Sequence, residues 1–540
     1  MARRAGSMNM AYILSLLILV PLLGAVVAWV AGTSQRLAKL IALGFSLVET
    51  ALASFLLVGF INPSWGVLFG PPIATPPPTP GAYVPLFYME RYTWISQFGL
   101  NYIVGVDGLS IPLIWLTALL TTLALVFHWD EENRPRAFFG LFLFLEMALA
   151  GVFMSLDFFL FAIFWELVLF PMFFLIGIWG GPNRRYAALK FLIFTHVGFV
   201  IMLIGIFTLY FNSAGVNNAV YGNPTNTLDM TAFLHGALRH ETGGLATYLS
   251  LALQIPIFAV FLFGFIVKLP SFPFHTWLPD AHVEAPTGGS VLLAGVLLKM
   301  GGYGIFRINL GMLPEAMKNL WWVLAILGTV SMVYAAFVCL AQVDLKRLIA
   351  YSSVGHMGFV LLGASSLTVI GVQGAIFQLF NHGIITAILF MLAGSVKHAT
   401  GTRDIPDLQG LAKVMPQFSL ILAIGFFASL GLPGLNSFWS EFMVFVGAYG
   451  SPNLGEMRRL IIIPLISIVV TAAYYVYTMQ RILFGDVPEK LGHSHDLLPW
   501  ERVSYVVLVA LVFLVGFFPV PFLGMINAYT SASFPWLGGL

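Results

Sequence analysis

The chain has 540 residues, of which 59% are hydrophobic and only 9% carry a charged side chain. Soluble proteins carry about 25% charged residues, so this composition excludes a soluble domain and indicates a polytopic membrane protein. The net charge is only +2, and the sequence contains no basic block that would favour nucleic-acid binding. The single cysteine, Cys339, excludes both an intrachain disulfide and a cysteine-held iron–sulfur cluster.

About 14 apolar segments are long enough to cross a membrane as helices. We therefore expect one all-α membrane domain over residues 1–540. The predicted spans are 11–31, 37–60, 107–128, 136–155, 157–179, 187–212, 249–268, 288–310, 320–340, 346–365, 369–396, 418–449, 460–482 and 503–525.

Two stretches between these spans are long and irregular. Residues 61–105 contain the proline-rich run from Pro71 to Pro80, which predicts an extended loop. Residues 213–248 are rich in Asn, Gly and Thr, which predicts a surface loop. When successive loops are assigned to alternate sides, one side holds 15 Lys and Arg and the other holds 8. The basic side is expected to be cytoplasmic, which places both termini on the non-cytoplasmic side.

Two of the predicted spans contain helix-breaking residues beside an ionisable group. Lys268-Leu-Pro270-Ser-Phe-Pro273 interrupts the seventh span, because proline removes a backbone donor and clashes with the preceding turn. Gly431-Leu-Pro433-Gly434, followed by Glu441, interrupts the twelfth. The two breaks are five spans apart and therefore have opposite orientation, as inverted repeats require. We predict repeats over 136–310 (helices 4–8) and 320–482 (helices 9–13).

Ionisable groups within the spans form an ordered series of acid, acid, base, base, histidine, histidine and acid. An intramembrane charge costs about 2.5–3.5 kcal/mol on insertion scales and marks an ion or proton pathway by default. Burial disfavours a charged lysine and a nearby carboxylate restores it, while histidine titrates readily, so such groups suit a proton relay. The candidates are Glu146 (as an accessory group), Glu166, Lys268, Lys299, His356, His382 and Glu441.

Each candidate also has a structural interpretation. Glu166 and Lys268 could form a static buried ion pair that fixes helix packing. His356 and His382 could be held by neighbouring hydroxyl or amide groups without titrating, and Glu146 could simply be paired. Four further groups near span ends are expected to be caps or entrance residues, because solvation is cheap there: Asp107, Asp280, His282 and Glu284.

Haem or metal binding is a weaker hypothesis. His356 and His382 lie in adjacent spans, as a bis-histidine haem site needs, but the chain offers no second pair. His493 and His495 lie in a polar loop without further ligands, so we discount a metal site there.

Several motifs, taken in order, resemble one known family over about residues 100–485. The chain resembles the subunit M (chain 4) family of NADH–quinone oxidoreductase, also called respiratory complex I or NDH-1, within the wider group of antiporter-like membrane subunits. The motifs are Gly105-Val-Asp-Gly-Leu-Ser110, Trp165-Glu-Leu-Val-Leu-Phe-Pro171, Trp277-Leu-Pro-Asp-Ala-His-Val-Glu-Ala-Pro-Thr287, Asp344-Leu-Lys-Arg-Leu-Ile-Ala-Tyr-Ser-Ser353, and Leu432-Pro-Gly434 followed by Glu441.

The resemblance implies a 14-helix bundle with two inverted five-helix repeats and a role for each candidate residue. It pairs Glu166 with Lys268, makes Lys299 the central lysine, lets His356 and His382 bridge onward, and places Glu441 at the exit. It also implies no redox cofactor in this chain. Quinone and iron–sulfur clusters, with flavin as a further option, are expected in partner subunits.

The resemblance further implies a proton-translocating subunit of an NAD(P)H- or ferredoxin:quinone oxidoreductase, in a prokaryotic plasma or thylakoid membrane. Its partners would be other membrane subunits, including further antiporter-like chains, together with the lipid bilayer and protons. An alternative with the same fold is a subunit of a multi-chain Na⁺/H⁺ antiporter, against which Glu441 and the motif at 105–110 argue. A passive scaffold is a third reading, which the two intramembrane lysines make costly. The electron donor, the quinone type, the proton stoichiometry and transport of Na⁺ stay open at this point.

Overall fold

The computed structural model describes residues 12–32, 34–62, 86–238 and 249–537. Thirteen helical spans within these residues are long and apolar enough to cross a membrane. A further crossing is made by two short helices in series, α18 (Pro416–Ser429) and α19 (Asn436–Tyr449). The predicted all-α membrane bundle of about 14 spans is therefore confirmed.

The first half of the bundle contains α1 (Ile13–Ala31), α2 (Gln35–Ile61), α3 (Ser110–Phe127), α4 (Pro135–Met154), α5 (Phe158–Leu167), α6 (Leu169–Trp179), α7 (Arg184–Phe211), α8 (Ala214–Tyr221), α9 (Met230–Leu238), α10 (Leu251–Lys268), α11 (Trp277–Glu284), α12 (Thr287–Leu292) and α13 (Leu298–Gly304). The second half contains α14 (Pro314–Leu340), α15 (Leu345–Ser365), α16 (Val369–Thr400), α17 (Leu411–Val414), α18, α19, α20 (Leu454–Leu483), α21 (Pro499–Phe517) and α22 (Val520–Ser533). Short 3₁₀ turns lie at Ser96–Phe98, Ile405–Asp407 and Glu489–Leu491, and π-helical turns at Leu293–Leu297 and Ile305–Leu310.

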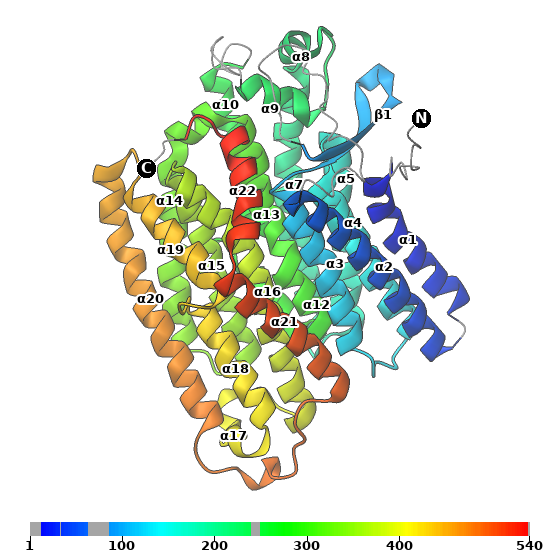
Figure 1. Cartoon of the computed structure of the whole chain (residues 1–540), viewed down its shortest axis with the longest axis vertical. Helices are drawn as coiled ribbons and strands as arrows, with labels where there is room; N and C mark the ends of the chain where they lie inside the picture. Colours follow the sequence, from blue (N-terminus) through cyan, green and yellow to red (C-terminus); the bar gives the residue numbers. More distant parts are fainter. Residues whose placement is uncertain (1–11, 33, 63–85, 239–248, 538–540) are drawn as a thin grey trace, which may run out of the picture.

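Two spans form the centre of the bundle. The segment Thr287–Leu310, which contains α12 and α13, and α16 (Val369–Thr400) are buried along their whole apolar windows, whereas α1, α2 and α20 expose more than half of theirs. Figure 1 shows α12, α13 and α16 in the middle of the molecule, with α1 and α2 at one flank and α20 at the other. Lys299 and His382 therefore lie on the most enclosed helices.

The predicted breaks in the seventh and twelfth spans are confirmed. Helix α10 ends at Lys268, and the chain turns through 269–276 before α11 begins. Between α18 and α19, Gly431 and Gly434 adopt φ values of 74° and 91°, which L side chains rarely adopt. The predicted inverted-repeat boundaries remain a prediction.

The predicted loop at 61–105 contains a β-hairpin, so that prediction was wrong for its second half. Strands β1 (Tyr88–Ile95) and β2 (Leu100–Val106) pair antiparallel, with Tyr88 opposite Val106. Alternating aromatic and β-branched residues favour strands, and Gly99 turns the chain with φ 64°. The proline-rich run from Pro71 to Pro80 lies outside the described residues. Because the hairpin lies at one end of the bundle together with α8 and α9 (Figure 1), we call this the hairpin end.

The second predicted loop, 213–248, is also partly helical. Helices α8 and α9 pack together there, and Met230 and Phe233 of α9 are buried. The apolar residues of this small core are scattered among polar residues in the sequence, so the composition of the segment did not indicate the two helices. Residues 239–248 lie outside the described residues.

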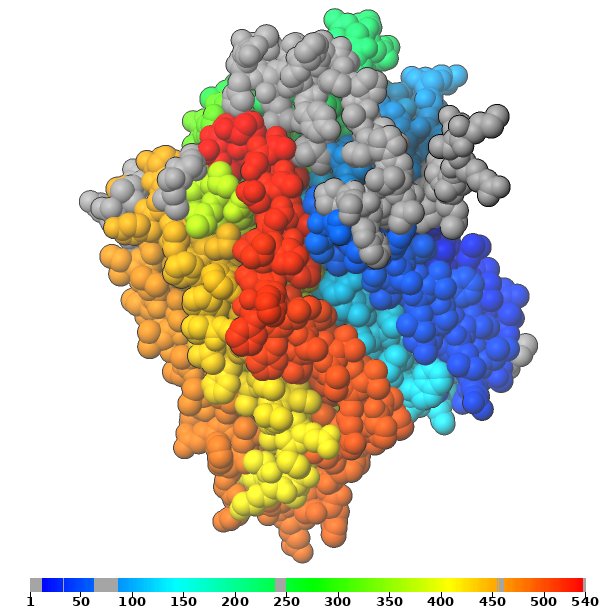
Figure 2. Space-filling view, in the orientation of Figure 1, coloured from blue at the N-terminus to red at the C-terminus, as the bar shows by residue number. Residues whose placement is uncertain are grey.

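The last predicted span, 503–525, is divided between two helices in the structure. Helix α21 ends at Phe517, and a separate helix, α22, begins at Val520, directly after Pro519. In Figure 2, α22 (red) runs along the surface between α2 (blue) and α19 (yellow). Gly108 permits a close approach there, since a Cβ on it would lie 1.9 Å from the Met525 carbonyl oxygen. The C-terminal segment thus joins the two halves of the bundle.

Candidate proton-transfer site

Glu166 lies on α5, one residue before this helix ends at Leu167. Its Oε2 is 2.8 Å from Nδ1 of His196 on α7, and its Oε1 is buried without a hydrogen-bond partner. Lys268 is close enough to act on Glu166 electrostatically, but the two side chains are beyond ion-pair distance. The expected contact between Glu166 and Lys268 is therefore not formed, and Glu166 contacts His196 instead.

Lys268 occupies the last position of α10, directly before the helix break. Its side chain is fully buried, and its Nζ has no hydrogen-bond partner among the described residues. The ammonium lies 5.4 Å above the ring of Trp165, a cation–π contact. Trp165 precedes Glu166 in the chain, so one helix turn places both an aromatic face and a carboxylate near this lysine.

Lys299 lies at the centre of the bundle on α13, between two π-helical turns. Single π turns inside helices occur frequently at functional sites. Its Nζ donates to the Ala294 carbonyl and lies 2.8 Å from Nδ1 of His382 on α16. Gly301 brings α13 against the break in α10, because a Cβ on it would lie 2.5 Å from the Phe265 carbonyl oxygen.

A continuous run of ionisable groups extends from Lys299 through α16 and α15 to α19. The rings of His382 and His356 are 5.4 Å apart between centroids. Nδ1 of His356 is 3.5 Å from Oε1 of Glu441, and Nε2 is 2.9 Å from the Ser429 hydroxyl, which lies 2.5 Å from the Tyr475 hydroxyl. The structure thus brings Lys299, both histidines and Glu441 together.

The end of this run borders a small cavity of about 20 Å³, whose mostly apolar lining also includes His356, Ser429 and Glu441. This volume is enough for a single water molecule, which needs roughly 10–15 Å³. Gly431, in the break between α18 and α19, lies against Glu441, since a Cβ on it would be 2.6 Å from Oε2. The broken helix therefore lets its backbone approach the terminal carboxylate.

Glu146 is separate from this run. It lies on α4, where its Oε1 is 3.5 Å from the Ser46 hydroxyl and its charge interacts with that of Glu49, both on α2. It contacts none of the six other candidates. Glu49 was missed in the sequence, although it is the only acid in the second predicted span.

Two of the groups at span ends are fully buried. Asp107 caps the start of α3, as expected, because its Oδ1 accepts the backbone N–H groups of Leu109 at 3.0 Å and Ser110 at 3.1 Å. Asp107 forms an ion pair with Arg307, with Oδ2 and Nη1 2.6 Å apart and both side chains at 1% exposure or less. His282 stacks on Phe390, with ring centroids 4.2 Å apart. Helix ends covered by neighbouring segments are not in contact with water, so only the expected solvation of these two groups was wrong.

Asp280 and Glu284 each contact a neighbouring segment, and their expected role as caps or entrance residues stays a prediction. Asp280 forms ion pairs with Lys190 at 2.6 Å and Arg347 at 3.2 Å. Glu284 accepts a hydrogen bond from the Asn183 backbone N–H at 2.9 Å.

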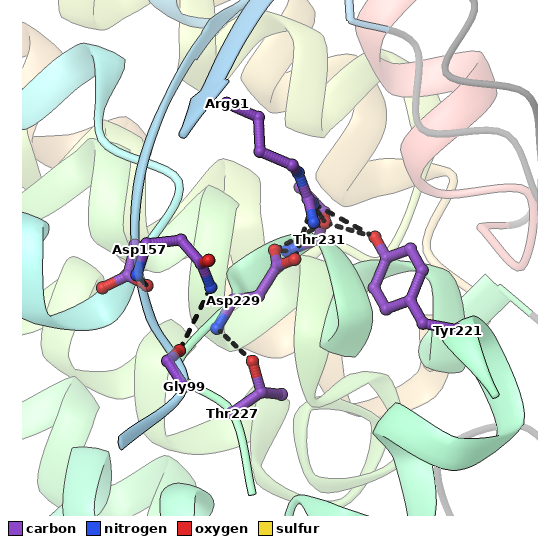
Figure 3. Close-up of polar contacts among 8 residues, drawn as sticks. Arg91, Gly99, Asp157, Tyr221, Thr227, Asp229 and Thr231 are labelled. Carbon is purple, nitrogen blue, oxygen red and sulfur yellow. Dashed lines mark hydrogen bonds and ion pairs between the residues drawn. The ribbon is translucent and has the colours of Figure 1, made fainter. Parts of the chain in front are cut away.

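A polar cluster at the hairpin end fixes the start of the helix that carries Glu166. Asp157 precedes α5 and accepts bonds from the backbone N–H groups of Phe159 at 2.8 Å and Asn101 at 3.2 Å. Burial raises the pKa of Asp157 to about 7. Nearby, Arg91 of β1 contacts Asp229 at 2.6 Å (Figure 3). The hairpin and the segment before α9 are therefore both tied to the start of α5.

With the geometry described, similarity to known proteins identifies the family. Residues 155–470 match the family described as "NADH:quinone oxidoreductase/Mrp antiporter, TM". The chain belongs to this family. It is 42% identical over 514 residues to F(420)H(2) dehydrogenase subunit M of Methanosarcina mazei, covering 95% of this chain and 96% of that one.

Other members of the NADH:quinone oxidoreductase/Mrp antiporter family are also similar. NAD(P)H-quinone oxidoreductase chain 4 of Trichormus variabilis is 41% identical over 437 residues, covering 80% of this chain and 78% of that one. A chain in the structure of respiratory complex I from Thermus thermophilus superposes with a TM-score of 0.81 at 27% identity, covering 97% of this chain and 100% of that one. The predicted resemblance is confirmed.

Proposed function

We propose that this chain is the proton-translocating, antiporter-like membrane subunit of a complex that reduces quinone in other subunits. Its similarity at 41–42% identity to subunits of F(420)H(2) dehydrogenase and NAD(P)H-quinone oxidoreductase supports this assignment. The observation that carries it is the buried run from Lys299 to Glu441 through two histidines.

Proton transfer in this proposal begins at Lys299. Its Nζ is within one hydrogen bond of His382, so a proton can pass from the ammonium to the neutral imidazole nitrogen without a large movement. His356 receives the proton next and passes it to Glu441, with a water in the cavity beside these two side chains as a further carrier. The proton then leaves on the far side of α19.

Glu166 acts as the switch in this proposal. Bound to His196, as here, it leaves Lys268 without a counter-charge in ion-pair contact. When Glu166 moves to Lys268 instead, the positive charge of that lysine is compensated. The positive potential acting on Lys299 then falls, so its affinity for a proton rises. Alternation of Glu166 between the two partners would therefore load and release the proton on Lys299.

Electron transfer belongs to other subunits in this proposal. Quinone and iron–sulfur clusters, with flavin as an option, would lie in partner chains, and further antiporter-like chains would lie beside this one. The proposed location of the chain is an energy-transducing prokaryotic membrane. Both termini would lie on the non-cytoplasmic side, as the distribution of basic residues favours. The two halves, 136–310 and 320–482, would act as inverted repeats around the central helices.

The experiment that tests this proposal is purification of the tagged chain in its native assembly. We expect iron–sulfur signals by electron paramagnetic resonance, quinone reductase activity and, after reconstitution into liposomes, acidification driven by quinone reduction. An assembly of antiporter-like chains without iron, which exchanges Na⁺ for protons, would overturn it and favour the antiporter alternative.

A matched pair of variants then connects the activity to this chain. Glu166→Gln removes the proposed switch without changing the side-chain shape, and Glu315→Gln removes an acid that lies half-exposed in a surface ion pair with Lys318. Pumping should fall strongly only in Glu166→Gln. Equal pumping in both variants would contradict the switch.

A further inference from the structure

Gln378 contacts both ends of the last transfer step in the proposed relay, from His356 to Glu441. It is fully buried on α16, about one helix turn before His382. Its Nε2 is 3.3 Å from Nδ1 of His356 on α15, and its Oε1 is 2.5 Å from the hydroxyl of Ser440, the neighbour of Glu441 on α19. The amide therefore joins three helices where the proton passes from a histidine to the terminal carboxylate.

The orientation of this amide follows from the shorter of its two contacts. A separation of 2.5 Å suits an O–H···O hydrogen bond but is too short for an N–H···O bond, which spans about 2.7–3.2 Å. The amide oxygen therefore faces Ser440, and the NH₂ group faces His356. The same Ser440 hydroxyl accepts a hydrogen bond from the Asn381 amide at 3.2 Å, which leaves its own proton for an acceptor.

This orientation decides which nitrogen of His356 carries a proton. A side-chain NH₂ group can only donate, so Nδ1 of the imidazole accepts and is unprotonated. The ring proton then lies on Nε2, which donates to the Ser429 hydroxyl at 2.9 Å. That hydroxyl lies 2.5 Å from the Tyr475 hydroxyl, which fixes it in turn. Both ring nitrogens therefore have a partner, and His356 is held as one neutral tautomer.

Glu441 is a second group that faces the same nitrogen. Its Oε1 is 3.5 Å from Nδ1 of His356 and has no hydrogen-bond partner among the described residues. A carboxylate oxygen cannot bond an unprotonated nitrogen, but it accepts readily from an N–H group. When His356 takes up a proton at Nδ1, the Gln378 NH₂ group loses its acceptor and Glu441 gains a donor. The proton can then pass to Glu441, because the NH₂ group cannot accept it.

We propose that Gln378 is a positioning residue that gates the transfer from His356 to Glu441, a role that rests on the proposed function. It keeps the proton of the neutral imidazole on Nε2, so that Nδ1, which faces Glu441, takes up the next one. In one cycle Nδ1 gains a proton and its bond to the amide breaks. Transfer of that proton to Oε1 of Glu441 restores the neutral imidazole and the amide bond. A protonated Glu441 would then have to displace the amide before it could bond Nδ1, which slows return of the proton.

The test is ¹⁵N nuclear magnetic resonance of histidine in the purified assembly, which distinguishes the two neutral tautomers and needs no quinone reduction. The His356 signals are those that disappear in His356→Asn. We expect the tautomer with the proton on Nε2 in the wild type. Gln378→Met keeps the length of the side chain but removes the amide, so the tautomer with the proton on Nδ1, bonded to Glu441, should become populated.

Gln373→Met is the matched control, because Gln373 lies on the same helix and its amide donates instead to Asn527 on α22 at 2.9 Å. It should keep the wild-type tautomer. Ser440→Ala leaves Gln378 in place but removes the hydroxyl that orients its amide, so it should shift the tautomer in the same direction to a smaller extent. A proton on Nδ1 in the wild type, or the wild-type tautomer in both Gln378→Met and Ser440→Ala, would overturn the proposal.

A second measurement reports the gate itself. A proton gradient is imposed across liposomes that contain the assembly, and its decay is followed without quinone reduction. The gradient should decay several-fold faster with Gln378→Met than with the wild type or Gln373→Met, and equal decay would refute the gating role. Failure of the proposed function would appear elsewhere, as an unchanged number of protons per quinone reduced in Glu441→Gln, and would leave the tautomer result in place.

Discussion

Replacing Lys299 with methionine tests the centre of the proposed relay. Methionine keeps the length and apolar stem of lysine but removes the ammonium that bonds the Ala294 carbonyl and contacts His382. The proton would then have no carrier next to Nδ1 of His382. We expect the chain to assemble but to translocate protons poorly.

The magnitude follows from two opposing contributions. Removing an intramembrane charge is favourable by about 2.5–3.5 kcal/mol, whereas each of the two buried acceptors left unpaired costs about 1–3 kcal/mol. The net change in folding free energy should therefore not exceed about 3.5 kcal/mol of destabilisation. The loss of pumping has a separate cause, the missing proton carrier beside His382, and every 1.4 kcal/mol that this adds to the transfer barrier slows proton transfer about tenfold. We expect at least a roughly tenfold loss of pumping.

The assay is acidification of liposomes that contain the reconstituted assembly, with quinone reduction followed in the same sample. Lys299→Arg is the matched variant, because arginine retains a buried donor and a positive charge but does not give up its proton in proteins. Both variants should lose pumping. Pumping at the wild-type rate in Lys299→Met would refute the relay, and pumping in Lys299→Arg alone would show that Lys299 supplies only charge.

Three further predictions concern other buried groups. Glu166→Gln should lower pumping while the assembly stays intact in native gels; wild-type acidification would exclude a switching role. Arg307→Met should destabilise the chain by about 3–5 kcal/mol because it leaves Asp107 buried and unpaired, and thermal unfolding at the wild-type temperature would contradict this. Burial raises the pKa of Asp157 from 3.8 to about 7, so the folded chain binds this proton more tightly and loses stability as pH rises between those values. Asp157→Asn should flatten this pH dependence of thermal unfolding, and parallel curves for the two proteins would contradict the assignment.

The sequence was informative where a residue type has few compatible environments. Pro270 and Pro273 cannot continue a helix, and the break after Lys268 lies where they predict it. A charged group is tolerated at few positions within an apolar membrane span. Lys299 and Glu441 could therefore be identified as candidates before their neighbours were known.

The sequence could not show which side chains of other helices each ionisable group faces. His196 and Glu166 come from different helices, as do Glu49 and Glu146, and the position of a residue along its own span does not show which side chains it faces. The hairpin was missed for a related reason, because a proline-rich stretch masked the short alternating pattern that follows it. The burial of Asp107 depends on segments that fold over the span end from elsewhere in the chain.

The central claim is that protons cross the membrane through the run that ends at Glu441. Its most direct test is the number of protons translocated per quinone reduced, measured in liposomes with the wild-type assembly and with Glu441→Gln. The account predicts a lower ratio in the variant, because an amide cannot accept the proton from His356. An unchanged ratio would contradict it and place the pathway outside these residues.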